Sequence, residues 1–84
     1  MKVKDGFILR KVGRQYVVAA TGEASKNFNG MLRLNEEAAF AFGLLQKGIE
    51  RDALVAAVTE KYPAETGADV DAFLEALKEA DAFA

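Results

Sequence analysis

The chain changes character at one short stretch, where a strand-like run of large apolar residues meets a strong helix start. Met31–Leu34 reads Met-Leu-Arg-Leu, and Asn35 follows it directly. Asparagine is a favoured N-cap because its side-chain oxygen accepts a hydrogen bond from an unpaired backbone N–H of the first turn. Glu36 and Glu37 then place negative charge where the helix dipole favours it. The sequence therefore predicts strands before this point and helices after it.

Two earlier strands are expected, joined by a tight turn. Phe7–Val12 is largely apolar, and Gln15–Ala20 contains aromatic and β-branched residues that suit a pleated sheet. Gly13 and Arg14 lie between them. A two-residue loop that begins with glycine is typical of a type II′ hairpin turn, so we predict a β-hairpin here.

The third strand is predicted at Met31–Leu34, after a polar loop over residues 21–27. The pair Asn29-Gly30 is either a second tight turn or a bulge that begins this strand, and we favour the bulge. If the third strand lies at the edge of the sheet, its unpaired backbone groups form a template for another chain.

The first helix is expected over 36–47, ended by Gly48, because glycine readily adopts the left-handed geometry at a helix C-terminus. Gly43 inside this helix costs about 1 kcal/mol relative to alanine, which a close helix contact would explain. The apolar face of the helix is predicted to contain Phe40, Phe42, Leu44 and Leu45.

The second helix is expected over 51–62, because Pro63 disfavours helical geometry in the residue before it. Glu50 is a poor N-cap for it. One stripe of this helix holds Leu54, Val55, Val58 and Tyr62.

The third helix is expected to start near Thr66, which forms a capping-box pattern with Asp69. An apolar stripe along this helix follows the i, i+3, i+4, i+7 rule and contains Val70, Phe73, Leu74 and Leu77. Phe83 either extends this stripe or covers the end of the core. A three-stranded antiparallel sheet followed by a three-helix bundle predicts an α+β, winged-helix-like fold.

Length and composition point to one globular domain that spans 1–84. The chain has 84 residues, of which 51% are hydrophobic, and it contains no cysteine. A disulfide framework and a thiolate metal site are therefore excluded. The N-terminus lacks the apolar core of a signal peptide, and no apolar run approaches the roughly 20 residues that span a bilayer. We expect a cytoplasmic protein without membrane contact.

Charge is distributed unevenly along the chain. Residues 1–34 carry a net charge of +5, residues 35–65 carry −3 and residues 66–84 carry −4.

An enzyme is disfavoured, because histidine and cysteine, the commonest general base and the thiol nucleophile, are both absent. A DNA-binding regulator, which a winged-helix arrangement first suggests, is the alternative. The third helix contains one lysine and several acidic residues, which would repel DNA phosphates. Peptide binding by strand addition therefore fits the sequence better than DNA binding.

The order and spacing of these segments resemble the PqqD family over nearly the whole chain. The resemblance is found at 6–10, 16–18 and 28–36, at Leu54 and Val55 with Tyr62, and at 69–77. It implies a non-catalytic precursor-peptide recognition domain, without a cofactor, for ribosomally made and post-translationally modified peptides. Such domains bind the leader segment of a precursor as an added strand and present it to a modifying enzyme, often a radical S-adenosylmethionine enzyme.

By this resemblance, the leader is expected to pair with the third strand and to lie in a cleft beside the third helix. Chains of this type serve many pathways, so the precursor and the enzyme stay open, and a homodimer through the same sheet edge is a further possibility. We also expect a leader of mixed charge, with basic residues facing Asp69, Asp71 or Glu75. The expected peptide-binding residues are Met31, Leu32, Arg33, Leu34, Asp69, Val70, Phe73, Leu74 and Leu77.

Overall fold

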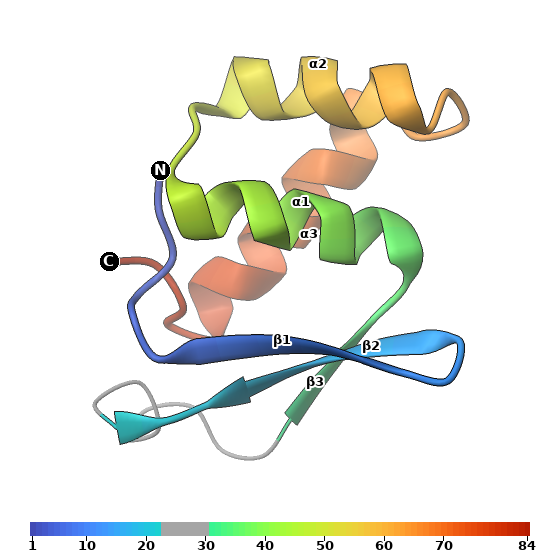
Figure 1. Cartoon of the computed structure of the whole chain (residues 1–84). Helices are drawn as coiled ribbons and strands as arrows, with labels where there is room; N and C mark the ends of the chain where they lie inside the picture. Colours follow the sequence, from blue (N-terminus) through green and yellow to red (C-terminus); the bar gives the residue numbers. More distant parts are fainter. Residues whose placement is uncertain (23–30) are drawn as a thin grey trace.

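A computed structural model of the chain describes residues 1–22 and 31–84. Three strands precede three helices, and α1 lies between the sheet and α2 while α3 crosses behind them (Figure 1). The elements are β1 (Phe7–Val12), β2 (Gln15–Ala20), β3 (Met31–Leu34), α1 (Glu36–Lys47), α2 (Arg51–Lys61) and α3 (Gly67–Glu79). The predicted α+β, winged-helix-like arrangement is confirmed.

The sheet has the strand order β1-β2-β3, and both pairings are antiparallel. Val12 lies opposite Gln15, so the predicted two-residue hairpin is confirmed. Gly13 has a φ of 63°, the positive value that the first position of a type II′ turn requires. The predicted loop from residue 23 onward and the Asn29-Gly30 turn or bulge lie outside the described residues.

The helix boundaries follow from their caps. Asn35 caps α1, with its Oδ1 atom accepting a hydrogen bond from the N–H of Ala38 at 2.8 Å. Gly48 ends α1 with a φ of 96°. The capping box of Thr66 and Asp69 is present in both directions at the start of α3. As expected from its sequence, Glu50 makes no side-chain cap at the start of α2.

Two details of the helices differ from expectation. Tyr62 is not part of α2 but follows it, with φ −128° and ψ 83°, because Pro63 excludes it from helical geometry. The close helix contact that would have explained Gly43 is not found among the described residues, where a Cβ atom at this position would meet no atom within 4 Å outside the backbone of its own helix. The packing of the described residues therefore does not explain why glycine is present at position 43.

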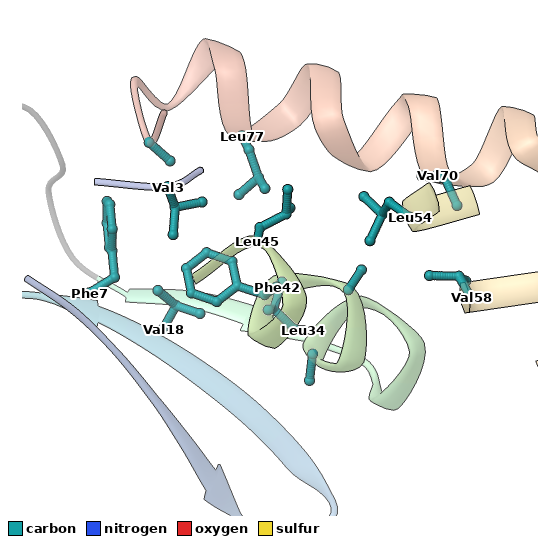
Figure 2. Close-up of a cluster of buried hydrophobic side chains, with 13 residues drawn as sticks. Val3, Phe7, Val18, Leu34, Phe42, Leu45, Leu54, Val58, Val70 and Leu77 are labelled. Carbon is teal, nitrogen blue, oxygen red and sulfur yellow. The ribbon is translucent and has the colours of Figure 1, made fainter. Parts of the chain in front are cut away.

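The core lies between the sheet and the three helices. Figure 2 shows Val70 and Leu77 directed from α3 into a cluster that includes Phe42 and Leu45 of α1. The most deeply buried large side chains come from four different elements, which are thereby held together. They are Val18, Phe42, Leu45, Leu54 and Leu77.

Both ends of the chain close one side of this core, which the sequence had predicted only as one of two alternatives for Phe83. Val3 is buried and forms a β-bridge with Phe83, so Phe83 covers the core and does not extend α3. Lys4 donates its backbone N–H to Ala82 at 2.7 Å, and its Nζ atom lies 2.8 Å from Oδ2 of Asp81. The two ends lie side by side in Figure 1.

Candidate functional site

The site begins with β3, which lies at one edge of the sheet. Its register with β2 runs from Met31 opposite Ala19 to Leu34 opposite Tyr16. Within residues 1–22 and 31–84, β2 is the strand that pairs with β3, and no strand occupies the other flank. Along that flank alternate N–H and C=O groups point away from the sheet, as in any antiparallel edge strand.

The side chains of β3 alternate between two environments. Leu34 is buried, with 6% of its surface exposed, and Leu32 is half-buried against the core. Met31 is 69% exposed and Arg33 is exposed. This is the two-residue period of a strand with one face on the core and one in solvent.

A groove of about 330 Å³ opens where β3 runs into α1. Asn35 and the first turns of α1 form one side, and the first half of α3 forms the other. The buried side chains of Ala41, Val58 and Val70 give it an apolar floor. The complete lining is Asn35, Glu37, Ala38, Ala41, Val58, Glu65, Asp69, Val70 and Phe73.

The five α3 residues expected to bind a peptide fall into different positions. Asp69, Val70 and Phe73 line the groove. Val70 and Leu77 are core residues, with 4% and 0% of their surfaces exposed. Phe73 and Leu74 are half-buried and pack against the core. Phe73 is therefore the large apolar side chain of α3 that both lines the groove and retains exposed surface.

The carboxylate of Asp69 is engaged in its own helix cap. Its Oδ2 atom accepts hydrogen bonds from the backbone N–H of Thr66 at 2.9 Å and from the Thr66 hydroxyl at 3.0 Å. The hydrogen bond from the Thr66 backbone, and to a smaller extent that from its hydroxyl, holds the pKa of Asp69 below its ordinary value. Asp69 therefore shapes the groove mainly by fixing the start of α3.

Asp71 is engaged in an ion pair with α2. Its two carboxylate oxygens accept hydrogen bonds from Nε and Nη2 of Arg51 at 2.9 and 2.8 Å. The hydrogen bond to Arg51 lowers the pKa of Asp71. The expectation that Asp69, Asp71 or Glu75 faces a basic leader residue stays a prediction, and in this structure intramolecular partners already bind the carboxylates of Asp69 and Asp71.

Glu65 and Glu37 add negative charge to the rim of the groove. Burial raises the pKa of Glu65, and so do the negative charge of Asp69 and a hydrogen bond to it. A second hollow of about 450 Å³ adjoins the groove, since Asn35, Glu37 and Glu65 line both. Tyr62 borders this hollow, and its burial, followed by a hydrogen bond to Glu36, raises its pKa to about 12.

Most residues that line the groove were not predicted from the sequence. Asn35 and Glu37 were interpreted as helix-start signals, which they are, and Val58 as part of an apolar stripe. Their meeting with α3 depends on how the helices cross, for which the local sequence carries no signal. The missed lining residues are Asn35, Glu37, Ala38, Ala41, Val58 and Glu65.

The described residues show no signs of other kinds of site. Among them, no group of three or more His, Cys, Asp or Glu residues is placed to hold a metal ion. None of their helices combines the length and the apolar character needed to cross a membrane. The exposed acids of α3, which include Glu75 and Glu79, outnumber Lys78, so this helix would repel nucleic-acid phosphates.

Known proteins share this arrangement. The family model described as coenzyme PQQ synthesis protein D (PqqD) matches residues 11–82. The chain belongs to the PqqD family. The solved structure of TbiB1 in complex with the TbiA(beta) leader peptide has a similar fold, with a TM-score of 0.74 and 19% sequence identity. The match covers 98% of this chain and 93% of that one, whereas no curated protein matches.

Proposed function

We propose that this PqqD-family chain acts as a single, non-catalytic module that binds the leader segment of a ribosomally made precursor peptide. The leader adds as a fourth strand along the open flank of β3. Its inward side chains enter the space between β3 and α3, beside Leu32 and Phe73. The module then presents the precursor to a modifying enzyme, such as a radical S-adenosylmethionine enzyme.

The observation that carries this proposal is the flank of β3, which no described strand occupies and which ends at the groove. Strand addition needs unpaired backbone groups for affinity and pockets at alternate positions for specificity. β3 supplies the first, and the groove with its Phe73 side chain supplies the second. Membership of the PqqD family and the likeness to TbiB1, which was solved with a leader peptide, support the same interpretation.

Amide hydrogen exchange of β3 tests the proposal. A short precursor is expected to be encoded beside this gene, and a synthetic copy of its leader is the probe. In the free protein, the amides of Met31–Leu34 should alternate between slow exchange, where they bond to β2, and fast exchange, where they face the open flank. The leader should slow the fast-exchanging amides. Unchanged exchange at saturating leader would contradict strand addition at β3.

A matched pair of variants separates binding from folding. Phe73→Ala should weaken leader binding and reduce the free energy of unfolding by less than the roughly 3–5 kcal/mol of a fully buried ring. Leu77→Ala removes a fully buried side chain of the same helix and should cost about 2–5 kcal/mol of stability. Its folded fraction should keep leader affinity. Equal losses of affinity in both folded variants would remove Phe73 from the site.

A further inference from the structure

The solvent face of the sheet combines apolar and basic side chains. Because strand residues alternate in direction, the register places Arg10, Val17 and Arg33 in one row across this face. Ile8, Ala19 and Met31 form the neighbouring row. The three strands contain no aspartate or glutamate. The row that ends at Arg33 therefore reaches the open edge with positive charge.

A hollow of about 300 Å³ lies beside Arg33 at the end of β3. Its lining includes Arg14 from the hairpin turn and Arg33, against one acid, Glu36. Among the described residues, neither arginine takes part in an ion pair. Asn35 lines this hollow and also the groove described above, so the two depressions meet at the end of the edge strand.

A strand added to β3 must send its side chains alternately to the two faces of the sheet. One set points inward to the groove and the half-buried Phe73. The other set extends the outward rows, next to Met31 and Arg33. A side chain that extends the row of Arg33 comes within cross-strand distance of a guanidinium that has no ion-pair partner in the described part of the chain.

We propose that the bound segment carries a carboxylate, from aspartate or glutamate, at the outward position beside Arg33, where Arg14 and Arg33 hold it at the basic hollow. This inference rests on the proposed function and adds a rule of selection to it. Opposite charges across neighbouring strands stabilise pairing, and like charges weaken it. A segment with lysine or arginine at this position is rejected, even when its backbone pairs equally well.

Designed peptides test the rule without a known precursor. Three acetylated and amidated heptapeptides have the sequence Thr-Leu-X-Leu-X-Leu-Thr, in which both X residues are Glu, Gln or Lys. Binding is measured from the NMR shifts of the Met31–Leu34 amides at low salt. The Glu peptide should bind about 1.5- to 5-fold more tightly than the Gln peptide, and the Lys peptide most weakly. High salt should reduce these differences.

Charge reversal gives the decisive comparison. In Arg33→Glu the order should invert, with the Lys peptide binding best, whereas Arg33→Lys should keep the original order. Arg10→Glu is the matched control, because Arg10 lies in the same row but at the opposite edge of the sheet. Equal affinities, an order that Arg33→Glu does not change, or no binding by any peptide would overturn the rule. The exchange experiment with the precursor leader judges strand addition separately.

Discussion

At the scale of single residues, Gly43 is a position where we expect alanine to stabilise the fold more than the glycine that is present. It lies inside α1, and outside the backbone of that helix a Cβ atom there would meet no atom of the described residues within 4 Å. Glycine in a helix interior is destabilising because the unfolded chain gains more conformational freedom than with alanine. Nothing in the described packing offsets this effect.

Gly43→Ala should therefore raise the free energy of unfolding by about 1 kcal/mol. This corresponds to a rise in melting temperature of about 4–8 °C for a chain of this size, measured by circular dichroism. The matched control is Gly48→Ala, which should lower stability because Gly48 has a φ of 96° that a side chain disfavours. A neutral or destabilising Gly43→Ala would reveal a contact absent from the described residues.

Single residues whose effect is local were also the ones that the sequence predicted well. Asn35, Gly13 and the Thr66 capping box act on neighbours a few positions away, so their patterns are visible in the chain. The Arg51–Asp71 pair joins residues 20 positions apart and had no such pattern. Its formation depends on the crossing of two helices.

At the scale of elements, the Arg51–Asp71 pair links the start of α2 to α3. Helix α3 also contains Phe73, which lines the groove. The pair is solvent-exposed, with 47% and 52% of the two side chains accessible. Its contribution to stability is therefore reduced by solvent screening. Its geometry is nevertheless bidentate, which fixes the angle between the partners.

Acid unfolding should report this link. Because the folded-state pKa of Asp71 lies below its ordinary value of 3.8, the stabilisation is present above pH 3.8 and is lost as pH falls below it. Asp71→Asn should thus be less stable than the unchanged chain at neutral pH, and the difference should shrink in acid. Urea unfolding at several pH values measures it. Glu75→Gln, an exposed position on the same helix, is the control, and an equal response there would contradict the assignment.

The bounds of strands and helices were predictable because each depends on a period, a cap or a breaker in its own sequence. The groove was not, since it arises from three helices and the end of a strand. Phe73 illustrates the difference. Its place in an apolar stripe was evident from the sequence, but its partial exposure depends on the groove between the first turns of α1 and α3. Leu77 belongs to the same stripe and is fully buried.

At the scale of the whole molecule, the two ends of the chain complete the core together. Val3 donates its backbone N–H to Leu45 at 3.1 Å, and Ala84 donates to Lys2 at 3.0 Å. The side chains of Val3 and Ala82 are both buried beneath this pairing. A position at the core was predicted from the sequence only for Phe83, as one of two alternatives, because neither end forms a periodic element of its own.

Val3→Ala should consequently reduce the free energy of unfolding by about 2 kcal/mol, from lost apolar burial and an unfilled cavity. Val12→Ala is the matched control, since Val12 is 60% exposed and its truncation should change stability by less than about 0.5 kcal/mol. Urea denaturation of both variants measures the difference. Similar values for the two valines would show that the N-terminal segment does not stabilise the core.

The open side of β3 also has a consequence for the protein when no peptide is bound. Exposed strand edges invite copies of the same molecule to join and ultimately to aggregate. β3 is four residues long and bears an outward arginine, two features that shorten and weaken any such self-made ladder. We therefore expect the short length of β3 and its outward arginine to disfavour association of two copies through this edge.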